Sequence, residues 1–169
     1  MIRMLRIANG GRKIKRVSFE LGEGHDGMAS FEKRSINAET VLLAIQGAAA
    51  KARQMGQAMS IAISDESGIL KGFLRMDGAS DMTRSIATDK AYSSATLGRP
   101  THALWDAFKN DPPLLHGIVN YPRMTAFGGG YPILEDGKVI GAIGISGGHY
   151  SDDMEVARAG LQAIGAPVG

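Results

Sequence analysis

The segment 128–148, GGGYPILEDGKVIGAIGISGG, holds eight glycines in 21 positions and constrains the fold more than any other stretch. Glycines this dense either cradle a phosphate or let two backbones pack closely. A dinucleotide-binding turn requires a strand, then G-x-G-x-x-G, then a helix, whereas Gly141 and Gly144 fall inside a strand pattern here. The following helix pattern opens with Asp152 and Asp153, whose carboxylates would repel a phosphate. We therefore predict that these glycines are mainly structural.

Strand alternation accounts for the glycines in a simpler way. Along 139–146, one face of the expected strand carries Val139, Ile143 and Ile145. The opposite face carries Ile140, Ala142, Gly144 and Ser146. The segment 59–64 divides in the same way, with Met59, Ile61 and Ile63 opposite Ser60, Ala62 and Ser64. We expect one face of the sheet to be lined by small residues, which lets an Ala-rich helix or another subunit approach it closely.

Cap and turn signals predict the order helix, hairpin, two helices, hairpin, helix. Asn37 is expected to cap a helix that stops at Gly56. The later predicted elements are a hairpin over 59–76, a helix over 81–97, a helix from Thr101 that buries Leu104, Trp105 and Phe108, a hairpin of 131–135 and 138–146 joined at Asp136-Gly137, and a helix from Ser151. Residues 110–130 are predicted to be mostly loop, with a short strand near 118–125. Paired hairpins favour an antiparallel sheet with helices packed on it, an α+β domain.

The composition fits one domain and excludes several kinds of site. Of the 169 residues, 44% are hydrophobic, which is enough for a core. The chain has no cysteine, so disulfides, thiol nucleophiles and Cys-based zinc or iron–sulfur sites are excluded. No apolar run reaches the roughly 18 residues that a spanning helix needs. We expect no membrane partner and a cytoplasmic location.

Residues 1–34 differ from the rest of the chain. They are rich in glycine and charge, with a weak strand-like alternation of Val17, Phe19 and Leu21. Nucleic-acid binding would need their basic charge on a folded face with aromatic side chains between, and only Phe19 is nearby. We expect no nucleic-acid partner, and we treat 1–34 as an N-terminal arm without an assigned role and 35–169 as one domain.

Four motifs carry a family resemblance: FLRMDGA (73–79), ATDKAYSSATLGRPT (87–101), FGGGYPI (127–133), and VIGAIGISGG followed by DDMEVARAGL (152–161). In this order they resemble the GlcG/HbpS family of haem-binding and haem-degrading-like proteins, and the same domain resembles the C-terminal part of PduO-type cobalamin proteins. The resemblance implies a profilin-like α/β/α fold with a five-stranded antiparallel sheet flanked by helices. It also implies homo-oligomers from dimers to octamers, haem as a cofactor, and a place in catabolic gene clusters.

Two cations are candidates for chemistry. Lys90 lies on a helix otherwise built from small residues, where a lysine is paired, desolvated or extended to solvent. It is either a structural partner of Asp65 or Asp77, or an anion-binding and catalytic group. Arg75 ends the first hairpin, where its guanidinium could hold a carboxylate substrate or a haem propionate. An internal ion pair is the alternative for Arg75.

A haem or metal site in this chain would depend on its histidines as ligands. His116 lies in LLHGIVNYPRM, where four apolar residues offer a wall, and it is our candidate for an axial iron ligand and for an acid–base group. The alternative is a hydrogen-bonded loop histidine. Tyr121 and Arg123 add an oxygen ligand and a cation, and the Gly128, Gly129 and Gly130 backbone is either a structural turn or a ligand contact. His102, in the first turn of a helix, is expected to be exposed.

These residues support three functions. The first is a haem- or tetrapyrrole-binding module. The second is an enzyme acting on a small carboxylate or an oxygenated aromatic, with Lys90 and His116 as acid–base groups and an arginine as anion holder. The third is a structural or regulatory subunit. In the first two, the ligand site is expected between the 114–130 loop and the helix carrying Lys90, near a subunit interface.

Overall fold

The structure is a computed structural model of the chain that describes residues 29–118 and 120–168. Residues from Lys33 onward form one compact unit. The described residues form α1 (Ala38–Gln54), β1 (Ser60–Asp65), β2 (Leu70–Arg75), α2 (Met82–Leu97), α3 (Thr101–Phe108), α4 (Pro112–Ile118), β3 (Gly130–Glu135), β4 (Lys138–Ser146) and α5 (Tyr150–Ala163). The predicted caps of α1 are confirmed: Asn37 Oδ1 accepts from Thr40 N at 2.8 Å, and Gly56 has a φ of +67°.

The four strands form an antiparallel sheet in the order β2-β1-β4-β3. The β3–β4 turn places Asp136 at φ +51° and Gly137 at φ +74°, the tight hairpin that the sequence predicts. The α+β class, with helices flanking an antiparallel sheet, is therefore confirmed. The expectation of five strands is wrong, because the sheet of the described residues has four.

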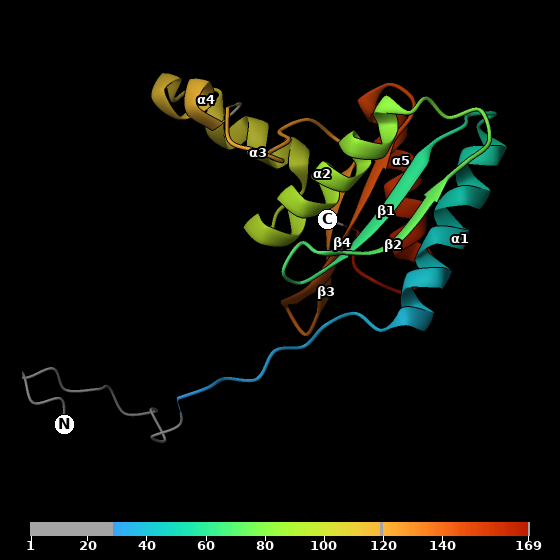
Figure 1. Ribbon diagram of the computed structural model, residues 1–169, viewed down its shortest axis with the longest axis horizontal. Helices are drawn as coiled ribbons and strands as arrows, with labels where there is room; N and C mark the ends of the chain where they lie inside the picture. Colours follow the sequence, from blue (N-terminus) through green and yellow to red (C-terminus); the bar gives the residue numbers. More distant parts are fainter. Residues whose placement is uncertain (1–28, 119, 169) are drawn as a thin grey trace, which may run out of the picture. The chain divides into compact units, whose positions relative to one another are not determined.

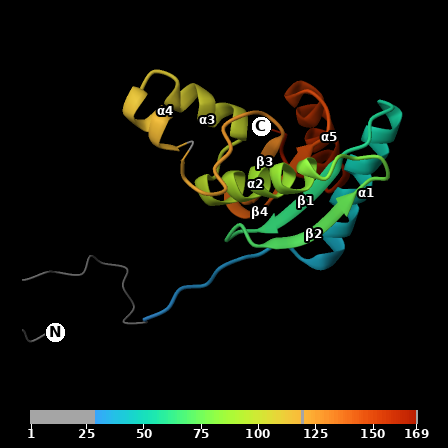
Figure 2. The same cartoon turned by 45° about the horizontal axis from the view of Figure 1, so that its top comes forward.

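Helices cover both faces of the sheet. Figures 1 and 2 show α1 and α5 packed side by side on one face and α2 alone on the other. The main core lies under α1 and α5 and includes Met59, Ile61 and Ile63. Ala62 packs instead with Ala87 and Ala91 of α2. The predicted division of β1 into a bulky face and a small face is confirmed.

Close packing explains the glycines within β4. A Cβ at Gly144 would overlap the carbonyl of Ala87 and lie 2.5 Å from the backbone N of Ala91, so β4 and α2 meet backbone to backbone. The helix that approaches the small face is Ala-rich, as the sequence predicts. The predicted faces of Val139 and Ile140 are wrong, because a β-bulge lies at the start of β4. The pairing with β3 shifts after Ile133. Ile140 therefore packs on the main core, and Val139 lies beside Gly98 at the end of α2.

The segment 110–130 is not mostly loop. Asp111 Oδ1 accepts from Leu114 N at 3.1 Å and Pro112 begins a helix, so the DPP motif that ends α3 also starts α4. The short strand near 118–125 does not form in the described residues there; Arg123 has a φ of +68°, outside the strand region.

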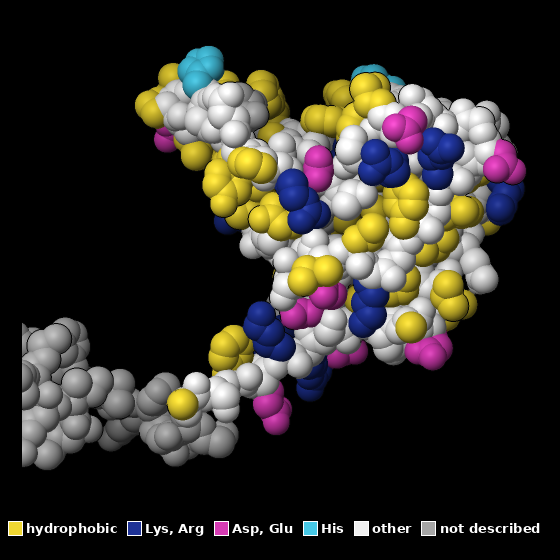
Figure 3. All heavy atoms as spheres, viewed as in Figure 1, with side chains coloured by type: hydrophobic (Ala, Val, Ile, Leu, Met, Phe, Trp, Pro, Cys, Tyr) yellow, Lys and Arg dark blue, Asp and Glu magenta, His cyan; other side chains and the backbone are white. Residues whose placement is uncertain are grey.

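α3 and α4 project together from the body of the sheet domain (Figure 1). Within the described residues, α4 contacts α3 alone among helices and strands. Leu104 is buried as predicted, but Trp105 is 48% exposed. Figure 3 shows hydrophobic side chains gathered on this projection, with a histidine at its end.

Most of the N-terminal arm, residues 1–28, lies outside the described residues. The alternation of Val17, Phe19 and Leu21 lies outside the described residues. Among the helices that are described, none is both long enough and apolar enough to cross a bilayer.

Candidate functional site

A buried ion pair joins α2 to α5. Lys90 Nζ lies 2.6 Å from Asp153 Oδ2 and donates a further hydrogen bond to the Ile145 carbonyl at 2.9 Å. The Lys90 side chain is wholly buried and that of Asp153 is 3% exposed. The partner of Lys90 is therefore Asp153, and the expected pairing with Asp65 or Asp77 is wrong. Asp65 instead accepts from backbone N–H groups of its own turn.

Burial and pairing act against each other in this ion pair. Desolvation lowers the pKa of Lys90, and the nearby Asp153 carboxylate opposes that change. Desolvation likewise raises the pKa of Asp153, opposed by Lys90 and by the backbone N–H groups of Gly148 and Gly147. Gly148 N donates to Asp153 Oδ1 at 3.2 Å. Each charge thus depends on the other, since both side chains are buried.

Phe127 covers the ion pair from the solvent side. Lys90 Nζ lies 4.7 Å from the centre of the Phe127 ring, and Phe127 itself is 47% exposed. This distance is within the range of a cation–π interaction. A ligand arriving at this surface would therefore meet the Phe127 ring before the Lys90 ammonium, unlike the direct contact that the sequence led us to expect.

The glycine run before β3 packs against the same pair. Gly128, Gly129 and Gly130 are all buried. Their backbone is therefore not exposed, contrary to what a ligand contact would need. Gly129 has a φ of +112°, and a Cβ there would lie 2.9 Å from Lys90 Nζ. Gly130 N donates to the buried hydroxyl of Thr101 at 3.0 Å. The run is a close-packed turn, and it does lie beside Lys90 as predicted.

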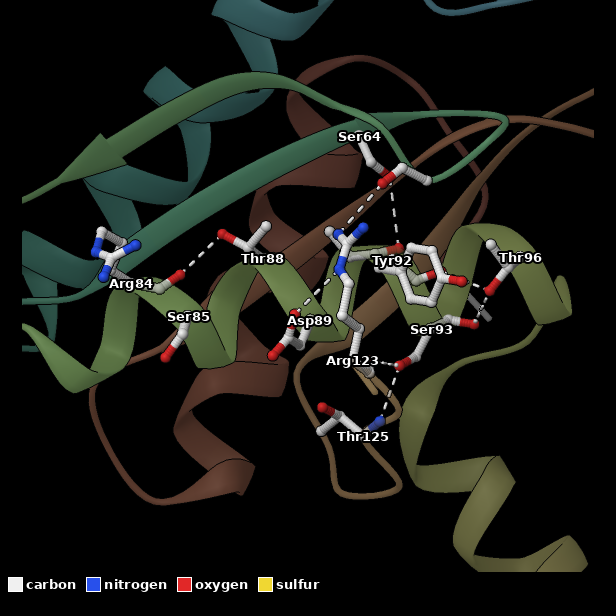
Figure 4. Close-up of polar contacts among 12 residues, drawn as sticks. Ser64, Arg84, Ser85, Thr88, Asp89, Tyr92, Ser93, Thr96, Arg123 and Thr125 are labelled. Atoms are coloured by element: carbon white, nitrogen blue, oxygen red, sulfur yellow. Dashed lines mark hydrogen bonds and ion pairs between the residues drawn. The ribbon is translucent and has the colours of Figure 1, made fainter. Parts of the chain in front are cut away.

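Arg123 forms a second, more exposed cluster on the outer surface of α2. Figure 4 shows its guanidinium lying over the ring of Tyr92 and reaching toward Asp89. The Arg123 Cζ is 4.0 Å from the Tyr92 ring centre, and Nε is 3.4 Å from Asp89 Oδ1. The Arg123 side chain keeps 41% exposure, so an anion could still reach it in competition with Asp89.

Ser93 holds the loop that carries Arg123. Its hydroxyl donates to the Arg123 carbonyl at 3.0 Å and accepts from Thr125 N at 2.8 Å (Figure 4). These two bonds fix a turn in which Arg123, a residue other than glycine, has a positive φ. The small hydroxyl residues of α2 thus position the loop.

His116 lies apart from Lys90, on the α3–α4 projection. It is exposed, and the contact recorded for it is through its carbonyl, which accepts from Asn120 Nδ2 at 2.8 Å. A narrow, mostly apolar crevice lies at the base of the projection, lined by Phe108, Ile118, Met124, Thr125 and Ala126. The imidazole is thus free to bind a ligand from solvent.

The remaining candidates are dispersed over the described surface. Tyr121 is 61% exposed. Arg75 pairs with Asp81 at 3.1 Å on an exposed surface, which is the internal ion pair considered as its alternative. Among the described residues, no group of three or more His, Asp or Glu side chains could hold a metal ion.

Sequence reasoning missed Asp153, Phe127, Tyr92 and Asp89 as parts of these clusters. Each stands inside a motif already singled out: Asp153 is the second residue of DDMEVARAGL, Phe127 opens FGGGYPI, and Asp89 and Tyr92 lie one position before and two positions after Lys90 in ATDKAYSSATLGRPT. The need of a buried lysine for a carboxylate partner was recognised from the sequence, but the partner was sought at Asp65 or Asp77 and not in the DDMEVARAGL motif.

Comparisons with known proteins agree with this architecture. A family model described as haem degrading protein HbpS-like matches residues 36–162. An uncharacterised 15.0 kDa protein of Citrobacter freundii is 35% identical over 121 residues, 70% of this chain and 84% of that protein. The corrinoid adenosyltransferase PduO of Salmonella typhimurium is 31% identical over 70% of this chain but only 36% of PduO. A solved complex of PduOC with haem has a TM-score of 0.72 at 27% identity, covering 79% of this chain and 98% of PduOC.

Proposed function

Because the chain belongs to the family described as haem degrading protein HbpS-like, we propose that it binds haem or a related tetrapyrrole. The observation that carries the proposal is the likeness to PduOC, which was solved with haem and is matched over 98% of its length. The family match also confirms the GlcG/HbpS resemblance identified from the four sequence motifs.

The described residues fit a surface-held haem. His116 offers an accessible imidazole on α4, and hydrophobic side chains gather on the same α3–α4 projection (Figure 3). A mostly apolar crevice lined by Phe108, Ile118 and Met124 lies at the base of that projection. One axial histidine with apolar walls is a common way to hold haem. Arg123 is a less available propionate partner, because Asp89 already faces its guanidinium.

Haem, when bound, supplies an iron centre capable of electron transfer and reaction with oxygen species. The chain's own residues would hold the haem and shape its surroundings. His116 would hold the iron, the apolar side chains of the α3–α4 projection would exclude water around the group, and the loop clamped by Ser93 would limit movement of the crevice wall.

Titration with hemin tests the proposal. We expect a saturable shift of the Soret band at a fixed stoichiometry. Replacing His116 with alanine should weaken binding by roughly tenfold or more and change the band position, because the axial nitrogen is lost. His149→Asn is the matched control, since it removes a second exposed histidine while keeping an acceptor for Ser151 N at the start of α5.

Two results would contradict the proposal at different levels. Absence of a saturable Soret shift in the unmodified protein would exclude haem as its ligand. Equal weakening by His116→Ala and His149→Asn would mean that exposed histidines bind hemin non-specifically, and the assignment of His116 would then be wrong.

The enzyme alternative has a weaker basis in the geometry. Acid–base catalysis on a carboxylate or oxygenated aromatic requires a group within hydrogen-bonding reach of the substrate. Lys90 is wholly buried behind Phe127, and His116 belongs to the separate α3–α4 projection. Tetrapyrrole binding needs only the exposed imidazole, so we rank it first.

A further inference from the structure

A third polar cluster lies at the edge strand β3, where side chains from three elements meet. Tyr131 of β3 is wholly buried, and its ring centre lies 5.6 Å from that of His102 in the first turn of α3. Arg158 of α5 places its Cζ 5.5 Å from the same Tyr131 ring. Neither the proposed haem surface nor the Lys90–Asp153 pair uses these residues.

Two polar atoms in this cluster are buried without a partner. In the part of the chain that the structure describes, neither Tyr131 Oη nor His102 Nδ1 has a hydrogen-bond partner. His102 is thus half-buried, which corrects the expectation that it would be exposed. Buried polar atoms are nearly always satisfied, by protein, water or a ligand. Two in contacting rings therefore indicate a position that an additional hydrogen-bonding group can occupy.

Arg158 supplies a charge beside these two atoms. No ion pair joins it to a carboxylate within residues 29–118 and 120–168. It also lines an open groove between α1 and α5, together with Lys51, Gln54 and Gln162. The groove's one carboxylate, Glu155, is paired with Lys51 at 3.2 Å. The groove thus gives solvent access to a guanidinium that has no anionic partner of its own.

We propose that His102, Tyr131 and Arg158 form a binding site for a small oxyanion, a carboxylate or a phosphate, that enters along the α1–α5 groove. The guanidinium would contribute charge-assisted hydrogen bonds. Burial raises the pKa of the Tyr131 hydroxyl and the nearby Arg158 opposes that change, so the hydroxyl stays protonated and would donate to the anion, as would His102 from Nδ1. The site shares no residue with the proposed haem surface.

The electrostatics of His102 supply a direct readout. Burial, and then the nearby Arg158 charge, lower the pKa of the His102 imidazole, whereas Asp106 opposes that change. The buried neighbour Tyr131 adds no charge at neutral pH. An anion bound between His102 and Arg158 would screen the guanidinium and favour the imidazolium. Its binding should therefore raise the pKa of His102.

Titration with sodium phosphate and, separately, sodium acetate tests the site, with chloride keeping the ionic strength constant. We expect a saturable change in the NMR signals of the His102 ring and a higher His102 pKa in the presence of one or both anions. The stronger of the two responses identifies the oxyanion class. Arg158→Gln should weaken the response by roughly tenfold or more, and Tyr131→Phe should weaken it less.

Lys51→Gln is the matched control, because it removes a neighbouring charge in the same groove without touching the cluster. A response that Lys51→Gln weakens as much as Arg158→Gln would mean diffuse attraction to the groove and would overturn the proposal. So would the absence of saturation relative to chloride. A response that follows protein concentration instead of anion concentration would assign the cluster to contact with a second copy. Hemin titration of Arg158→Gln should match the unmodified protein, which keeps the two proposals separable.

Discussion

At the scale of single residues, the Lys90–Asp153 pair links two helices from opposite faces of the sheet. Replacing Lys90 with methionine would leave the Asp153 carboxylate buried without its cation. We expect a loss of about 3–5 kcal/mol in the free energy of unfolding, measured by urea denaturation. This outcome would favour the structural ion pair over the anion-binding group, the two alternatives that the sequence left open for Lys90.

The double variant Lys90→Met with Asp153→Asn is the control for that measurement. It removes both charges but keeps an acceptor for Gly148 N, which donates to Asp153 Oδ1. We expect it to recover a large part of the lost stability, because no unpaired charge remains. If the single variant were as stable as the unmodified protein, the pair would not be intact in solution.

His102 gives the stability a dependence on pH. Its pKa is lowered in the folded chain, chiefly by burial and then by Arg158, so the unfolded chain takes up a proton at higher pH than the folded chain. The free energy of unfolding should therefore fall as the pH drops below about 6.5 and level off below the folded-state pKa. His102→Asn should flatten that part of the profile, measured by urea denaturation at a series of pH values.

Contacts between individual side chains were the feature that the sequence predicted least well. It identified Lys90 as an unusual lysine, but the partner stands 63 positions away, and only the packing of α5 against β4 brings Asp153 to it. His102 was expected to be exposed for the same reason: a position in the first turn of a helix gives no information about what covers it. Local patterns do not encode which side chains from distant elements meet.

At the scale of elements, β4 and α2 depend on the absence of side chains between them. Gly144→Val should destabilise the fold by about 1–3 kcal/mol or more, because the added side chain would meet the backbone of Ala87 and Ala91. Gly117→Ala in α4 is the matched control, since a Cβ there meets nothing within 4 Å. It should be neutral or stabilising by up to about 1 kcal/mol. Thermal or urea unfolding of both variants measures the difference, and equal stability would contradict the close-packing explanation.

Elements with strong local signals were predicted well, and those without were not. The Asn37 cap, the Asp136-Gly137 turn and the small face of β1 each follow from the residues at that place. The α4 helix was missed because residues 110–130 show no clear hydrophobic period, although Asp111 and Pro112 suit a helix start. The β-bulge places Val139 and Ile140 on the faces of the sheet opposite to those predicted. It depends on the pairing with β3, which cannot be predicted from the alternation within β4.

At the scale of the whole molecule, the sheet and its two helical layers follow from the hairpins and the glycine pattern, whereas the position of the candidate site does not. The sequence placed Lys90, His116 and the glycine run in one site. In the structure the glycine run covers Lys90, and His116 stands on the separate projection of α3 and α4. That separation arises because α4 turns residues 112–118 into a helix that packs on α3 instead of returning to α2.

The boundary of the folding unit can be tested by truncation. Buried core residues of the described chain begin at Ile36, which is 1% exposed and donates from its backbone N to the Ile140 carbonyl at 2.8 Å. Removing residues 1–27 should therefore change the melting temperature by no more than a few degrees. The state of assembly, measured by size-exclusion chromatography, should also stay the same. Removing 1–37 is the matched control, because it also takes away Ile36 and the Asn37 cap of α1, and it should lower the melting temperature clearly. If the shorter truncation lowered it as much, residues before 28 would belong to the folding unit, and the division between arm and domain would be wrong.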